Sequence, residues 1–466
     1  MFRFLDSLKS KPKNKFSLEN LQYLYNVLIK NPAINEQNKG LIVETLRQIA
    51  EVMIWGDQHS PDFFDFFAEK NIIGYFLKIL NQKGSREVHV QLIQTLSILL
   101  ENTKNQHSIY YILSNNHINE LITHKFDFSD DELLAYYISF LKALSLKLNS
   151  STIQFFFNER ANDFPLYTEA IKFFNHKEPM IRIAVRTLTL NVYKVEDDAM
   201  RRYILDKAAA PYFSNIVWYI RDQCTSLDTM VINANAALDY YSKARLEDFV
   251  AELLDYFYYL HDIFNQKINM MSEVLCVHLL ECLLLPQFVK SLIPKREQEQ
   301  LSKHEDIVNI AHIPPEYSDL DDDISPVLAV YCLSCIFYIF SFSKLVNTLA
   351  ARILHPNSED YLNNFYRTQP VNDNKQKVFL ALPTIPLKHK FRKIQSDPNL
   401  LSMHKPSTSY DNNQIEKSSS ETTKADCNSP TRYYSKLLDL LEADDRTVLG
   451  VATLFYSIIK STGIDQ

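Results

Sequence analysis

The sequence repeats one short pattern four times: Ile-Val-Glu-Thr-Leu at 42–46, Leu-Ile-Gln-Thr-Leu at 92–96, Phe-Leu-Lys-Ala-Leu at 140–144 and Ala-Val-Arg-Thr-Leu at 184–188. Each copy ends in a leucine preceded by a small residue, and the four leucines are 50, 48 and 44 residues apart. On a helix, the apolar pair and the leucine share one face, and the small residue lets a second helix approach closely. This period is typical of HEAT and armadillo units. The sequence therefore predicts an all-α, armadillo/HEAT-like α-solenoid.

Glycine is almost absent. The chain has six glycines, and none lies between Ser85 and Leu449. Phosphate-binding loops and nucleophile elbows need glycine for positive φ angles and close backbone approach, so their signatures cannot occur over most of the chain. The scarcity favours helices with polar or proline-marked ends. We expect the glycines at 56, 74 and 84 to lie at turns.

Composition indicates a globular cytoplasmic protein. Of its 466 residues 46% are apolar, and the net charge is -7. With a pI near 6.0 there is no overall basic field to recruit nucleic acid. Most of the six cysteines lie in apolar helical text, as reduced thiols do. No cofactor and no small-molecule substrate are indicated.

Local signals mark helix ends. Ser17 is the expected N-cap of a helix over 18–30, and Ser129 with Glu132 forms a capping box that opens a helix to about 148. Little or no sheet is expected. Further helices are predicted at about 211–223, 244–268, 272–290, 325–354 and 432–460.

Two polar stretches predict disordered insertions in the solenoid. The expected organisation is a basic N-terminal tail (1–16), a helical solenoid (17–293), a mobile acidic loop (294–324), further solenoid helices (325–355), a disordered linker (356–430) and a C-terminal helical element (431–466).

The segment from Ile324 to Ser343 has no charged residue and is about as long as a bilayer is thick. Two interpretations stay open, a membrane span and a buried solenoid helix. Four serines and two cysteines dilute its hydrophobicity, which favours the buried helix.

No spacing of reactive residues indicates catalysis. His304-Glu305 begins a zinc-protease motif, but Val308 occupies the position of the second histidine. The pair Cys332 and Cys335 forms a C-x-x-C pattern inside apolar helical text, where a structural role is favoured over redox or metal chemistry. We therefore predict no catalytic residue, no metal site and no enzymatic activity.

Short linear motifs are the better candidates for contacts. In the acidic loop, Tyr317 and Leu320 form a Tyr-x-x-Leu peptide that could add a strand to a partner or act as a sorting signal. In the linker, Ser396 lies in an Arg-x-x-x-Ser-x-Pro pattern typical of phosphoserine recognition. The cations Lys388, Lys390, Arg392 and Lys393 surround apolar residues and suit an acidic membrane surface.

Two pairs in the helical region are candidate partner contacts. Asp57 and Gln58 follow Trp55-Gly56 and are expected at the polar tip of a turn. Arg182 and Arg186 share a helix face and could meet an acidic partner, although such arginines also bridge adjacent repeats. Exposure of Arg182 beside a groove would favour binding.

Longer strings resemble the FPL-domain family. They include Glu-Val-Met-Ile-Trp-Gly-Asp-Gln at 51–58, Ser-Ile-Tyr-Tyr-Ile-Leu-Ser-Asn-Asn at 108–116, and Phe-Pro-Leu at 164–166 followed by Tyr-Thr-Glu-Ala-Ile-Lys-Phe-Phe-Asn-His. The resemblance is strong over roughly 16–290 and returns at Glu-Ala-Asp-Asp-Arg-Thr, 442–447.

The resemblance implies a cytosolic protein attached peripherally to endosomal, lysosomal or Golgi membranes, acting in endosome maturation, autophagy and mitophagy. It implies Rab-type GTPases, the HOPS tethering complex and a RING ubiquitin ligase as partners. The leading hypothesis is therefore a helical scaffold. The alternative is a ubiquitin ligase without a RING, or a regulator of one.

Overall fold

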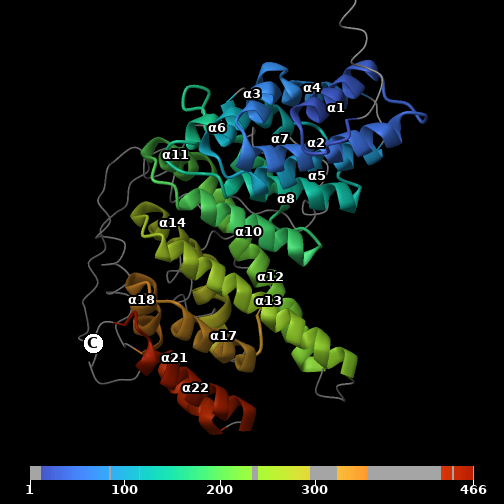
Figure 1. Ribbon diagram of the computed structural model, residues 1–466. Helices are drawn as coiled ribbons and strands as arrows, with labels where there is room; N and C mark the ends of the chain where they lie inside the picture. The colour runs from blue at the N-terminus through green and yellow to red at the C-terminus, as the bar shows by residue number, and fades with distance from the viewer. Residues whose placement is uncertain are drawn as a thin grey trace, which may run out of the picture. The chain divides into compact units, whose positions relative to one another are not determined.

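The computed structural model describes residues 12–82, 86–114, 116–233, 240–293, 323–354, 432–442 and 445–464 (Figure 1). In these ranges the regular structure is helical, apart from one isolated bridge between Asn158 and Asp163. The prediction of an all-α protein is confirmed. The chain forms two compact units, Met1–Ala208 and Ala209–Gln466.

The first unit is an array of short and long helices. Its long helices α2 (Lys39–His59), α5 (Arg86–Asn102), α8 (Asp131–Ser145) and α10 (Pro179–Tyr193) contact one another in that order. The other helices are α1 (Leu18–Lys30), α3 (Asp62–Glu69), α4 (Ile72–Leu80), α6 (Gln106–Ser114), α7 (His117–Ile122), η2 (Ile153–Phe155), α9 (Pro165–Ala170), η3 (Ile171–Phe173), α11 (Asp198–Tyr203) and the π-helix η4 (Ile204–Ala209).

The repeated leucines lie where these long helices meet. Leu46, Leu96, Leu144 and Leu188 are at most 1% exposed. Thr45, Thr95 and Ala143 beside them are also buried. Thr45 donates to the carbonyl of Leu41, which satisfies its hydroxyl within its own helix. The repeat read from the sequence is therefore the helix-packing repeat of the structure.

Polar ties between units of the repeat follow the same period. Backbone or side-chain hydrogen bonds join residues 43 to 50 positions apart, from Tyr111 with Ala68 to Gln82 with Pro32. Arg86 of α5 pairs with Asp130 and Glu132 at the start of α8. Lys147 Nζ donates to Thr103 O at 3.0 Å. Polar contacts of this kind thus join each helical repeat to the next.

Helix caps test the local predictions. Ser17 caps α1 as expected and accepts a bond from Asn20 N at 3.2 Å. The capping box at α8 is shifted by one residue, because Asp130 is the cap and accepts from Glu132 N and Leu133 N. Ser129 donates instead to Asp127 Oδ1. The carboxylate of Asp130 is a stronger acceptor than the hydroxyl of Ser129 and therefore takes the cap position.

The second unit contains the longest helices. They are α12 (Ala210–Asn233), α13 (Tyr240–Asn265), α14 (Asn269–Leu279), the π-helix η6 (Leu280–Val289), η7 (Lys290–Leu292), α17 (Pro326–Ile339), α18 (Ser343–Leu354), α21 (Arg432–Asp439), η8 (Leu440–Glu442) and α22 (Asp445–Lys460). α12 contacts α13, α14 and η6, and α17 contacts α13, η6 and α22.

The uncharged segment 324–343 is not one continuous helix. α17 ends at Ile339, Phe340 is extended, and α18 begins at Ser343. Most side chains of α17 are buried. In the described part of the chain, one helical stretch is long and apolar enough to cross a membrane, Asn269–Leu292, and 78% of its apolar window is buried inside the protein.

A buried arginine supports the π-helix. Pro286 lies inside η6, has no N–H and donates no backbone bond there. Arg221 of α12 donates to this irregular helix from outside, with Nη1 at 2.9 Å from Cys282 O. Gln287 returns the contact through Nε2, which donates to Arg221 O at 3.3 Å. A reciprocal clamp between α12 and η6 results.

We predict that Arg221→Met destabilises the second unit by about 1–3 kcal/mol, because the buried carbonyl of Cys282 loses a donor. The measurement is urea unfolding followed by Trp218 fluorescence in a Trp55→Phe background, since these are the two tryptophans of the chain. Exposed Arg245, over the ring of Phe249, gives the matched control Arg245→Met. Equal stability of the two variants would contradict the clamp.

Burial also controls a histidine of the second unit. His278 of α14 is 2% exposed, and no hydrogen bond to its Nδ1 occurs among the described residues. Desolvation lowers the pKa of His278 to about 4. The unfolded chain, with a pKa near 6.5, then binds more protons than the folded chain between pH 6.5 and 4.

The second unit should therefore lose stability as pH falls from 6.5 to 4, with about 3 kcal/mol due to His278. We predict that His278→Leu flattens this loss, as measured by unfolding free energies across that window. His261→Leu is the comparator, because burial lowers the pKa of His261 too, but its side chain is only half-buried. An unchanged pH slope in His278→Leu would contradict the assignment.

Candidate interaction site

The groove described for the first unit lies on the second half of α2. It has a volume of about 370 Å³ and is lined by Lys15, Phe16, Glu51, Ile54, Trp55, Gln58 and His59. The helix repeat places Glu51, Trp55 and His59 on one face, four residues apart. The other face buries Val52 and Met53. The core therefore holds the helix while the groove side stays accessible.

Aromatic rings form a stack at the groove. The rings of Trp55 and His59 lie 4.0 Å apart and nearly parallel, and Phe16 stacks on Trp55 at 5.7 Å. His59 Nδ1 lies 2.7 Å from Trp55 O, which fixes the imidazole. Phe63 of α3 meets the indole edge-on at 5.6 Å. Trp55 is thus held from several sides, with its surroundings preorganised for contact.

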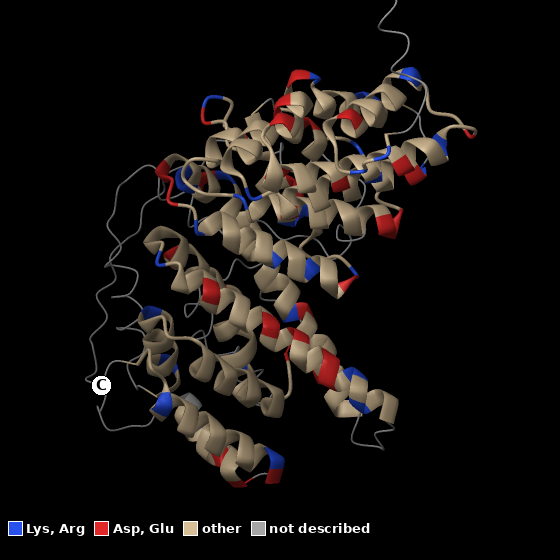
Figure 2. Cartoon of the chain, viewed as in Figure 1, with Lys and Arg blue, Asp and Glu red and all other residues tan. Residues whose placement is uncertain are grey.

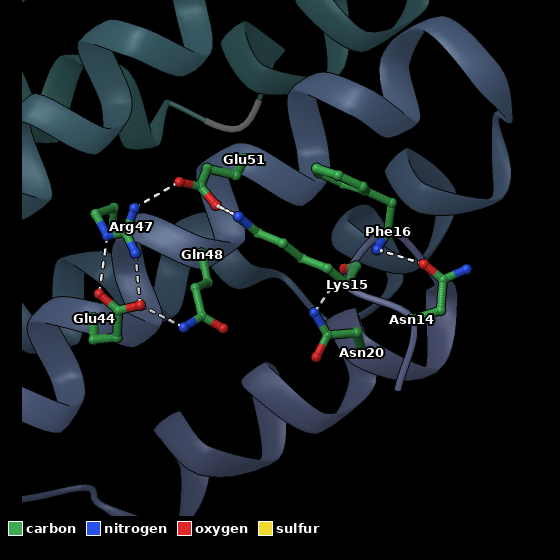
Figure 3. Close-up of polar contacts among 8 residues, drawn as sticks. All are labelled: Asn14, Lys15, Phe16, Asn20, Glu44, Arg47, Gln48 and Glu51. Carbon is green, nitrogen blue, oxygen red and sulfur yellow. Dashed lines mark hydrogen bonds and ion pairs between the residues drawn. The ribbon is translucent and has the colours of Figure 1, made fainter. Parts of the chain in front are cut away.

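Charges alternate along the same edge of α2 (Figure 3). Lys15 Nζ lies 2.5 Å from Glu51 Oε2, and Arg47 Nη1 lies 2.6 Å from Glu51 Oε1. Arg47 also donates two bonds to Glu44, at 2.9 and 2.7 Å. The hydrogen bond to Glu44, with the negative charges of Glu51 and Glu44, raises the pKa of Arg47. Glu51 therefore pairs both with Arg47 of its own helix and with Lys15 from the segment before α1.

Gly56 lets Phe63 of α3 pack closely against α2. We expected Gly56, Gly74 and Gly84 at turns. Gly84 lies outside the described residues, and Gly56 and Gly74 lie inside helices, α2 and α4. A Cβ on Gly56 would lie 2.4 Å from Phe63 Cγ. On Gly74 it would meet the Asn71 side chain at 2.5 Å. These glycines serve close packing rather than turn geometry.

The structure gives Asp57 and Gln58 different roles. α2 continues through both to His59, so they do not form the expected turn. Asp57 Oδ2 accepts from Lys104 N at 2.8 Å and Asn105 N at 3.1 Å, which ties α2 to the segment before α6. Gln58 is exposed and lines the groove. Of the pair, only Gln58 lies at the candidate site.

The arginine pair is internal. Arg182 and Arg186 are 5% and 9% exposed. Arg182 Nη1 donates to His176 O and to Lys177 O, the latter at 2.9 Å. The exposure that would favour partner binding at Arg182 is absent, and the guanidinium instead holds the turn before α10. Sequence spacing could not show this, because their burial depends on neighbouring elements.

The remaining candidates from the sequence lie outside the described residues: Tyr317, Leu320, Lys388, Lys390, Arg392, Lys393 and Ser396. The groove itself was missed in the sequence, although the string 51–58 that marks the family contains part of it. Trp55 followed at four residues by His59 was the available signal, since aromatic side chains at this spacing meet on a helix.

Two family models and several known proteins match this chain in sequence. The FPL family model, described as an uncharacterised conserved protein, matches residues 46–193, and the CLEC16A helical-domain model matches residues 241–378. Protein CLEC16A homolog of Drosophila melanogaster is 51% identical over 353 residues, 74% of this chain and 33% of its own length. The chain belongs to the FPL-domain, or CLEC16A, family.

Other relatives agree. Protein CLEC16A of Homo sapiens is 50% identical over 345 residues (74% of this chain, 31% of that protein). Protein TRANSPARENT TESTA 9 of Arabidopsis thaliana is 40% identical over 349 residues (74% and 39%). The chain thus spans about a third of the length of these relatives. An engineered protein of known structure aligns with 95% of the chain and 85% of its own, at a TM-score of 0.33 and 11% identity.

The tripeptide of the FPL family is part of the core. Phe164 caps α9, Pro165 is its first residue, and Leu166 is fully buried. Phe164 stacks on Tyr167 at 6.0 Å, and the hydroxyls of Tyr167 and Tyr193 are 2.7 Å apart. The family signature therefore joins α9 to α10. By contrast, Trp55 and His59, also within the FPL match, face the groove.

Most cysteines in the described part of the chain are buried. Cys224, Cys276, Cys282 and Cys332 are buried, and Cys335 is half-buried. Burial raises the pKa of Cys282 to about 12, and a hydrogen bond with Cys224 together with burial raises that of Cys332. The thiols of Cys282 and Cys332 therefore stay protonated at neutral pH. In the ranges that the structure describes, no three His, Cys, Asp or Glu residues form a group that could hold a metal ion.

We predict that Gly56→Ala destabilises the first unit by about 1–3 kcal/mol, because the new methyl group displaces Phe63 and α3. Gly40→Ala in the same helix is the control. Nothing lies within 4 Å of its added Cβ, so alanine should stabilise by up to about 1 kcal/mol. Urea unfolding followed by Trp55 fluorescence in a Trp218→Phe background measures both, and a stabilised Gly56→Ala would overturn the packing role.

Proposed function

We propose that this protein is a non-enzymatic helical scaffold that brings trafficking factors together on endosomal and lysosomal membranes, in endosome maturation, autophagy and mitophagy. The observation that carries the proposal is a stacked helical array in which α2 buries one face and carries an accessible groove, lined by Trp55 and Glu51, on the other. Such arrays work as extended binding surfaces. Membership of the FPL-domain family supports it.

Proteins are the partners that fit this surface. The proposed partners are a Rab-type GTPase, the HOPS tethering complex and a RING ubiquitin ligase. Figure 2 shows Asp and Glu along much of α13, where Glu247, Asp248, Glu252, Asp255 and Asp262 accompany two cations, Lys243 and Arg245. An acidic helix repels phosphates and favours basic protein surfaces. We place the protein in the cytoplasm, peripherally on these membranes.

The buried thiols bear on the alternative, a ligase that works without a RING. A thioester mechanism needs an accessible thiolate, and burial raises the pKa of Cys276 and Cys282 instead. These described cysteines are therefore poor nucleophiles. No observation favours the enzymatic alternative over the scaffold.

The test is affinity recovery of the tagged chain from cells, combined with fluorescence localisation. We expect recovery of at least one Rab GTPase, HOPS subunit or RING ligase, and puncta that overlap endosomal or lysosomal markers. Lys13→Gln, a change at an exposed residue, should behave as the natural chain does.

A diffuse cytosolic signal without any of these partners would overturn the scaffold proposal. A second arm incubates the purified chain with E1, E2 and ubiquitin. Ubiquitin chains formed without an added ligase would contradict a purely scaffolding role.

A further inference from the structure

Two adjacent residues attach the segment before α1 to the face of α2. Lys15 Nζ lies 2.5 Å from Glu51 Oε2 (Figure 3), and the next side chain, Phe16, stacks on Trp55. Glu51 and Trp55 are one helical turn apart. The cation Lys15 thus pairs with the carboxylate of Glu51, and the ring of Phe16 stacks on that of Trp55. The two pairs match in charge and in spacing.

The shape of this segment does not depend on α2. Phe16 N donates to Asn14 Oδ1 at 3.0 Å, and Ser17 Oγ donates to Asn14 O at 3.1 Å. Asn20, which is fully buried, donates through Nδ2 to Lys15 O at 2.8 Å. Hydrogen bonds within residues 14–20 therefore fix the turn, while Lys15 and Phe16 rest on α2 by side chain alone.

Their hold on α2 is weak enough to exchange. The side chain of Lys15 is 52% exposed and Phe16 is 37% exposed. The contacts to α2 are one exposed ion pair and one ring stack at the surface, and such contacts contribute little to stability compared with burial in a core. The groove beside them, bounded by Ile54, Gln58 and His59, gives another chain access to the same face.

The vacated face would select a cation. Arg47 is held by two bonds to Glu44 and one to Glu51 Oε1, which leaves Glu51 Oε2 to Lys15. Trp55, one helical turn further along α2, lines the same groove as Glu51. Both features favour a positive charge.

We propose that the face of α2 formed by Glu51 and Trp55 is a docking site for a lysine–aromatic pair of a partner polypeptide, which the chain's own Lys15 and Phe16 occupy when no partner is bound. This inference rests on the proposed scaffold function, since it specifies the chemistry of one contact. The partner's lysine pairs with Glu51, and its aromatic ring stacks on Trp55. Gln58 and His59 lie at the end of the groove, where the partner's polar backbone passes.

The experiment uses the full chain and a fluorescein-labelled peptide with the sequence of residues 10–17, Ser-Lys-Pro-Lys-Asn-Lys-Phe-Ser. Binding is measured by fluorescence anisotropy. A vacated chain, Lys15→Gln/Phe16→Ser, should bind the peptide at least about fivefold more tightly than the natural chain, because the internal competitor is gone. Adding Glu51→Gln should weaken this binding about tenfold, and circular dichroism checks that each variant is folded.

Matched controls separate the site from general charge effects. Glu120→Gln removes an exposed carboxylate of α7 that does not line the groove, so in the vacated chain it should leave binding unchanged. Lys13→Gln should behave like the natural chain. A peptide with glutamine in place of the lysine that precedes phenylalanine should bind about tenfold more weakly.

Several outcomes would overturn the inference. They are equal binding of the lysine and glutamine peptides, no gain on vacating the site, an equal effect of Glu120→Gln and Glu51→Gln, and competition by lysine amide as strong as by the unlabelled peptide. If these occur while the natural chain still recovers trafficking partners from cells, only the docking site fails. If the peptide binds as expected but no such partner is recovered, only the scaffold function fails.

Discussion

Close approach of successive helices is the constraint on which the first unit depends. At Leu46, Leu96, Leu144 and Leu188 the long helices meet over leucines beside small residues, and all four leucines are buried. Fully burying one leucine contributes about 1.5–3 kcal/mol relative to exposure, more than a surface ion pair contributes. Helices that meet this way must keep their register, so the polar ties between them recur at the same period of 43 to 50 residues. The packing of the leucines sets the period of the repeat, and the hydrogen bonds fix the register between successive helices.

The second unit meets a related constraint differently. Pro286 interrupts the backbone bonding of η6, and a helix in a core cannot leave a carbonyl without a donor. Arg221 enters the core to bond Cys282 O, and its guanidinium lies 5.0 Å from the ring of Trp218. A buried cation is unfavourable alone, but here it has a carbonyl and an aromatic face as partners. The buried arginine thus ties the irregular helix η6 to α12.

The sequence predicted what local pattern controls. The all-α class, the repeat and the Ser17 cap depend on residues a few positions apart, and the structure confirms them. The errors concern contacts between distant residues. Asp57 is a tie to 104–105, Gly56 makes room for Phe63, and Arg182 is buried. The groove needed Phe16 and Trp55 together, 39 positions apart, and no periodic signal records such a meeting.

Stability and recognition are thus carried by different side chains of the same helix. The buried face of α2, with Val52 and Met53, holds the array through apolar area, a contribution that charge screening by salt does not weaken. The exposed edge, from Glu44 to His59, is held by ion pairs and ring stacking that are individually weak. Exchange of contacts along that edge therefore leaves the packing intact. A scaffold needs this separation, because its partners must come and go while the array keeps its shape.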